Sequence, residues 1–191
     1  MSSRAGSLFR AALLAALLSG VLSGCGDNGG ADMETAWQLV TDRNFDGALP
    51  LVKARLERHP GDPAAHYLLG KCHLHRQNAN TTIALGEFET ALMFFELPGG
   101  TVCLGGRMDP AAFRAAVHRD AGLSLMRALY EAADKGLPPE LMGTVIERAL
   151  AHVNRGLESA PEDGYLLEMR ETLSQYAPAA PRPEFQREIT I

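Results

Sequence analysis

Residues 59–98 read HPGDPAAHYLLGKCHLHRQNANTTIALGEFETALMFFELP, and this stretch decides the fold class. Its apolar residues recur at spacings of three and four, which is the period of one face of an α-helix. Asp62 followed by Pro63 is a typical helix start, and Leu97-Pro98 ends a second helix. The stretch therefore predicts two consecutive helices, over 62–76 and 80–96.

The same helical period continues on both sides of this stretch, and almost no segment alternates apolar and polar residues as a β-strand does. Breaks at proline and glycine delimit five further helices, which are predicted over 32–42, 46–58, 110–135, 139–159 and 162–175. The sequence thus predicts an all-α fold. Eight apolar residues at helical spacing are expected in its core: Leu68, Leu69, Phe88, Leu92, Val117, Ile146, Leu150 and Val153.

Small residues, large residues and prolines return in the same order at three places in the chain. The three sets are Ala48, Val52, Arg55 and Pro60; Ala84, Phe88, Ala91 and Pro98; and Ala149, Val153, Gly156 and Pro161. This pattern, with Leu69-Gly70 one helix before Ala84, resembles the tetratricopeptide repeat, a helix-turn-helix unit of about 34 residues. His66 stands where that family usually has a tryptophan.

The resemblance covers roughly residues 31–176. It implies a short right-handed superhelix of about three helix pairs followed by a C-terminal capping helix. The repeat domain would occupy 32–176, with an insertion loop over 93–109. The Pro-rich tail over 177–191 is expected to be disordered.

The N-terminus has the zones of a secretory signal. Arg4 and Arg10 precede and border an apolar run over 11–22, which at about twelve residues is shorter than the roughly twenty that span a bilayer. Leu22-Ser23-Gly24-Cys25 resembles the bacterial lipobox, which implies a signal peptide over 1–24 and lipidation of Cys25. The alternative is an ordinary cleaved signal with a chance cysteine.

The expected location is the periplasmic side of the cell envelope. Residues 25–31 are predicted to be a flexible tether. Gly26 is not aspartate, and this favours the outer over the inner membrane by resemblance to known lipoproteins. Residues 1–24 hold two of the 18 basic and none of the 23 acidic residues, so sixteen basic and 23 acidic residues remain and give a net charge of −7. This acidic balance argues against a nucleic-acid partner and leaves the lipid as the anchor.

The sequence carries no recognisable catalytic or phosphate-binding motif, so we predict no enzymatic activity and no cofactor. Cys72, His73 and His75 form the one compact group of metal-ligating residue types, but a zinc site would need two further ligands. A metal- or small-ligand-binding lipoprotein that uses this cluster is the alternative function. Cys72 and Cys103 are either a disulfide or two buried thiols, because sequence does not give their distance.

A mixed basic and aromatic surface is predicted on two helices. Tyr67, Lys71 and His75 recur every four residues, and the repeat resemblance places them on the inner face of the superhelix. Arg119, Leu123 and Arg127 form a similar stripe. Such side chains suit protein recognition, so we expect a peptide or protein partner in this groove. The predicted function is a lipid-anchored adaptor or scaffold. In general plan it resembles the repeat-containing lipoproteins that take part in envelope, secretion or pilus assembly.

Overall fold

The computed structural model describes residues 30–104, 106–136 and 138–176, and this part of the chain is helical without any strand. The elements are α2 (Gly30–Thr41), α3 (Phe45–Arg58), α4 (Pro63–His75), α5 (Thr81–Phe95), the 3₁₀ helix η1 (Gly100–Leu104), α6 (Pro110–Asp134), α7 (Pro139–Ser159) and α8 (Gly164–Tyr176). The predicted all-α class is confirmed, and each predicted helix is present within two residues of its expected bounds. The predicted signal peptide, Cys25 and the tail over 177–191 lie outside the described residues.

Short polar side chains begin most of the helices. Asp62, Asp109 and Asp163 each accept hydrogen bonds from two backbone N–H groups at the start of α4, α6 and α8. Asn44 and Asn80 each accept one such bond at the start of α3 and α5. These bonds satisfy N–H groups that have no partner inside the helix, which is why the local sequence predicts the starts so closely.

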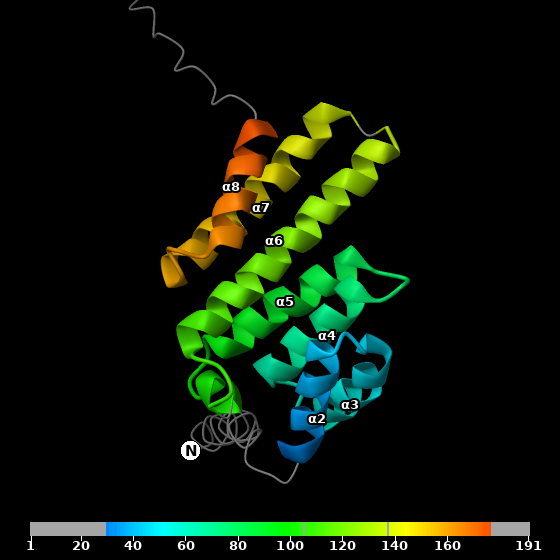
Figure 1. Ribbon diagram of the computed structural model, residues 1–191, viewed down its shortest axis with the longest axis vertical. Coiled ribbons are helices and arrows are strands. Elements are labelled where there is room, and N and C mark those ends of the chain that lie inside the picture. The colour runs from blue at the N-terminus through cyan, green and yellow to red at the C-terminus, as the bar shows by residue number, and fades with distance from the viewer. Residues whose placement is uncertain (1–29, 105, 137, 177–191) are drawn as a thin grey trace, which may run out of the picture.

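Each helix packs on the one that follows it in the chain, and this order builds an elongated array (Figure 1). The N-terminal helices α2 and α3 lie at one end and α8 at the other, while the long α6 lies between α5 and α7. Contacts also join α2 to α4, α4 to α6 and α6 to α8. Among the described residues, no helix is both long and apolar enough to cross a membrane.

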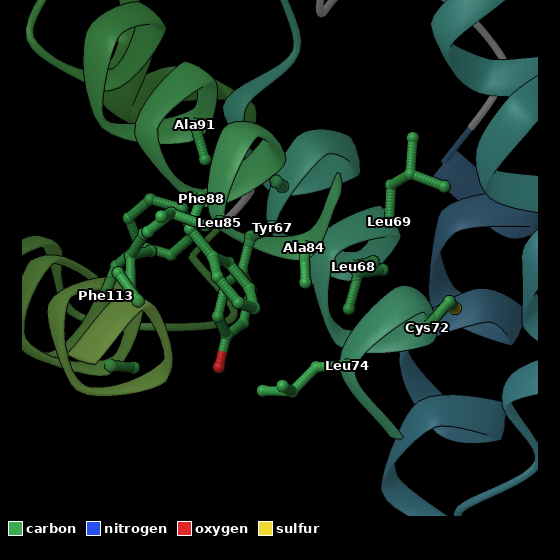
Figure 2. Packing of buried hydrophobic residues seen from close by; sticks show 14 of the residues in the cluster. Tyr67, Leu68, Leu69, Cys72, Leu74, Ala84, Leu85, Phe88, Ala91 and Phe113 are labelled. Carbon is green, nitrogen blue, oxygen red and sulfur yellow. The ribbon is translucent and has the colours of Figure 1, made fainter. Parts of the chain in front are cut away.

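A single apolar core runs along this array. Figure 2 shows its centre, where Leu68 and Leu69 of α4 and Phe88 of α5 lie with Phe113 of α6. Six of the eight predicted core residues are buried, and Leu92 and Leu150 are partly buried against the same core. The small and large residues of the repeated sets are buried as well: Ala48, Val52, Arg55, Ala84, Phe88, Ala91, Ala149, Val153 and Gly156.

Two expected boundaries need correction. The insertion loop expected over 93–109 is shorter, because α5 continues to Phe95 and η1 occupies Gly100–Leu104. Phe95 is buried and its ring lies 4.9 Å from that of Phe113, so the last turn of α5 packs against α6 instead of belonging to a loop. The boundary expected at residue 31 also changes, because α2 begins at Gly30; residues 25–29 lie outside the described residues.

Candidate functional site

The predicted stripe on α4 lines a hollow of about 310 Å³ beside α2 and α3. Tyr67, Lys71 and His75 lie in its wall because residues four apart share one face of a helix. The lining is completed by residues of α2, the following turn and the start of α3: Trp37, Val40, Thr41, Arg43 and Phe45. The hollow therefore combines aromatic and basic side chains from three successive helices.

Arg43 is placed at the hollow by the sharp turn between α2 and α3. Its φ of 59° is in the left-handed region, which is uncommon for any residue other than glycine. The next residue, Asn44, caps α3 by accepting a hydrogen bond from the Gly47 backbone N–H at 3.0 Å. Within the described ranges, no ion pair involves Arg43.

Asp120 of α6 holds the charged part of the stripe in place. The Tyr67 hydroxyl donates a hydrogen bond to its Oδ2 at 3.0 Å, and Lys71 Nζ lies 3.2 Å from the same oxygen. Arg119 Nε is 3.8 Å from Oδ1. Asp120 is only 3 % exposed, so a buried carboxylate fixes both groups. Burial and the neighbouring Asp120 carboxylate raise the pKa of Tyr67 well above its usual value, which keeps its hydroxyl a donor.

Tyr67 differs from its predicted role as an exposed contact residue. It is buried, and its ring lies 5.4 Å from Phe113, 5.8 Å from Trp37 and 5.9 Å from Phe88. Figure 2 shows this ring among the core side chains, with its hydroxyl pointing away from Phe88 and Leu85. Tyr67 thus forms the floor of the hollow and supports it, whereas Lys71 is partly accessible and His75 is exposed and stacked 5.3 Å from Phe45.

The second predicted stripe, on α6, reaches its neighbours at several points. Arg119 Nη1 lies 3.4 Å from Asp163 Oδ2, at the start of α8. Leu123 is partly buried against the core. Arg127 donates a hydrogen bond to the Leu74 carbonyl at 3.0 Å and pairs with Glu131 at 3.5 Å. Arg119 therefore meets Tyr67 and Lys71 at Asp120, whereas Arg127 reaches the end of α4 instead.

Asp120 was not predicted as a site residue from the sequence. It follows Val117 by three residues and precedes Ala121, which are both buried, so it lies on the buried face of its helix. A buried carboxylate needs hydrogen-bond or ion-pair partners, so an aspartate on the buried face of a predicted helix indicates a polar contact with another element. The partners themselves are 53 and 49 residues away in the chain, beyond the reach of local patterns.

The side chains of Cys72, His73 and His75 do not form a metal site. Cys72 is a free, fully buried thiol whose pKa burial raises to about 11. Burial lowers the pKa of His73; Glu87 opposes this effect and Lys53 adds to it. Burial also lowers the pKa of His75, where Lys71 adds to the effect and Asp120 opposes it. Within the described residues, no group of three His, Cys, Asp or Glu side chains is placed to hold a metal ion.

The free Cys72 thiol favours the buried-thiol alternative over a disulfide with Cys103. In Figure 2 the Cys72 sulfur points towards the N-terminal helices. The side chain of Cys103 lies outside the described residues, so the pairing itself stays a prediction.

Comparison with known proteins gives no relative: no family model, no curated protein and no solved structure matches this chain. The function proposed below therefore rests on the sequence and on the site.

Proposed function

We propose that this protein is a lipid-anchored adaptor that binds a peptide segment of a partner protein and catalyses no reaction. The observation that carries this proposal is the hollow of about 310 Å³ beside α2, α3 and α4. Aromatic rings give contact area and basic groups give directed hydrogen bonds, and both kinds of side chain are enriched where proteins bind one another.

Preorganisation supports the proposal. Lys71 and Tyr67 are held by Asp120 before any partner arrives, so less side-chain freedom is lost on binding. The stacked Phe45 and His75 rings form an aromatic rim. Arg43, which makes no ion pair among the described residues, is placed to meet an acidic group of the partner.

We further propose that the helices are three tetratricopeptide-like pairs, α2 with α3, α4 with α5 and α6 with α7, capped by α8. The buried small and large residues of the repeated sets support this arrangement. So do the contacts of α2 with α4, α4 with α6 and α6 with α8, because first helices of successive repeats meet along the inner face of such an array.

The hollow is tested by site-specific photo-crosslinking in cells. A photoreactive residue at His75, which is exposed and lines the hollow, should form an adduct with a discrete partner. The same residue at Lys53, exposed on α3 but outside the hollow, is the matched control. Arg43→Ala and Lys71→Ala should each reduce the His75 adduct. An adduct that forms equally at Lys53, or that survives both substitutions, contradicts binding in this hollow.

The anchor is tested separately. The resemblance of Leu22-Ser23-Gly24-Cys25 to the bacterial lipobox supports the proposal of a lipid anchor at the periplasmic face of a membrane, with the outer membrane favoured. Cells fed a labelled fatty acid should incorporate the label into this protein, and Cys25→Ala should abolish incorporation. Equal labelling of both forms would contradict lipidation at Cys25.

A further inference from the structure

A pair of buried histidines joins α6 to α7, away from the proposed binding hollow. His118 of α6 and His152 of α7 are 5 % and 7 % exposed, and their rings lie 5.3 Å apart. The two Nδ1 atoms are 3.1 Å apart, which is a hydrogen-bond distance. One ring nitrogen must therefore carry a hydrogen and donate a hydrogen bond to the other.

Glu89 of α5 decides the roles of the two rings. Its carboxylate lies 3.4 Å from His152 Nε2, so that nitrogen carries the proton and faces the acceptor. When both rings are neutral, His152 Nδ1 is then the acceptor and His118 Nδ1–H is the donor. Glu89 is itself held at 2.5 Å by Arg148.

A hollow of about 560 Å³ borders the pair, so protons and water can reach it. The charged groups that face the pair come from all three helices around it: Glu89 and Glu96 from α5, Arg114 from α6, and Arg148, Arg155 and Glu158 from α7. Leu166 of α8 packs where Gly156 and His118 meet, so α8 rests on the same contact.

Burial, the neighbouring His152 and the nearby Arg155 and Arg114 lower the pKa of His118 to about 4. Burial also lowers the pKa of His152, although the Glu89 carboxylate opposes this effect. Two rings in contact do not titrate independently, so the pair takes up its protons in two separate steps.

We propose that His118 and His152 form an acid-sensitive contact between α6 and α7. This contact persists when the pair takes up one proton and breaks when the pair takes up a second. The first proton makes His152 an imidazolium between Glu89 and His118. His118 then moves its own proton to Nε2 and accepts from His152 through Nδ1, so the hydrogen bond persists. A second proton leaves an N–H on both Nδ1 atoms, and two donors and two like charges face each other. The contact between α6 and α7 then weakens, and α8 loosens with it.

The test is amide hydrogen exchange, corrected for the intrinsic pH dependence, at pH 6.5 and pH 4.5. We expect protection of α7 and α8 amides to fall at least about tenfold more than that of α3 amides. His118→Gln and His152→Gln, which cannot take up the second proton, should remove this difference. The control His73→Gln changes a histidine outside the pair and should retain it. Equal loss of protection in α3 and α7, or an unchanged loss in both pair variants, overturns the proposal.

A second measurement does not depend on any variant folding. Imidazole ¹⁵N signals of the wild-type protein should show His118 and His152 titrating in two steps separated by more than about one pH unit. Independent titration of both rings near pH 6.5 would also contradict the proposed acid-sensitive contact.

Discussion

At the scale of single residues, Gly70 of α4 lies against a large side chain of the next helix. A Cβ atom at Gly70 of α4 would lie 2.5 Å from the Phe88 ring of α5. Glycine is needed there for space, since the helical backbone itself would accept alanine. Gly86 of α5, by contrast, would place a Cβ atom in open space.

These two glycines give opposite predictions for the same substitution. Gly70→Ala should destabilise the fold by about 1–3 kcal/mol, because the Phe88 ring must move in a filled core. Gly86→Ala should stabilise it by up to about 1 kcal/mol, because alanine reduces the entropy of the unfolded chain. Urea denaturation of both variants measures the difference, and a stabilising Gly70→Ala would show that α4 and α5 are further apart than described.

Asp120 is the residue on which the candidate site depends. Asp120→Asn removes the charge that holds Lys71 and an acceptor for Tyr67, and should cost about 1–3 kcal/mol. Lys71 is partly accessible, which keeps the effect below that of a fully buried pair. The control Asp46→Asn breaks a 2.6 Å ion pair with Arg76, but Asp46 is 73 % exposed and the cost should stay below about 1 kcal/mol. Equal costs in the two variants would refute an organising role for Asp120.

At the scale of elements, capping aspartates begin both α4 and α6, in different surroundings. Asp109 is exposed and accepts bonds from the Ala111 and Ala112 N–H groups. Asp62 makes the same kind of cap but is 2 % exposed and also pairs with Arg55 at 2.7 Å. Asp109 therefore only caps its own helix, whereas Asp62 also joins α3 to α4 through Arg55.

The two caps therefore predict different costs. Asp109→Ala should destabilise the protein by about 1 kcal/mol, the usual value of an N-cap. Asp62→Ala should cost roughly 3 kcal/mol or more, because it removes the cap and one side of a buried ion pair together. Thermal unfolding of the two variants decides this, and a larger loss for Asp109→Ala would contradict the assignment.

At the scale of the whole molecule, histidines link stability to pH. Burial lowers the pKa values of His73, His75, His118 and His152, so the unfolded chain binds protons more readily than the folded one. Their contribution is present above pH 6.5 and is lost as the pH falls towards their folded values. His66 has the opposite sign. Burial lowers its pKa, but bonds to Glu87 and the Pro60 carbonyl outweigh this and raise it, so its contribution is lost as the pH rises above 6.5.

We expect the free energy of unfolding to fall between pH 7 and pH 5. The shift of His118 from 6.5 to about 4 alone corresponds to a loss of about 2 kcal/mol at pH 5. Urea denaturation at pH 7, 6 and 5 measures this change, and His118→Gln should reduce its slope. Greater stability at pH 5 than at pH 7 would show that His66 outweighs the buried pair.

Much of the fold could be predicted from the sequence because its signals are local. Asp62 and Asp109, each followed by proline, set helix starts within a residue, and the repeated small and large residues mark the buried faces. The candidate site was predicted in part. Lys71, His75 and Arg119 were assigned to a binding surface from their spacing, but the burial of Tyr67 depends on Phe88 and Phe113, which belong to other helices.

The sequence by itself determined the helices and the caps that begin them, because each depends on residues within a few positions of one another. Only the tertiary structure decided which polar groups meet. Asp120 accepts a hydrogen bond from Tyr67, which is 53 residues away in the chain, and His118 contacts His152, which is 34 residues away. The packing of α6 against its neighbours brings these residues together. Such contacts depend on how whole helices pack against one another, and no short sequence pattern specifies this packing.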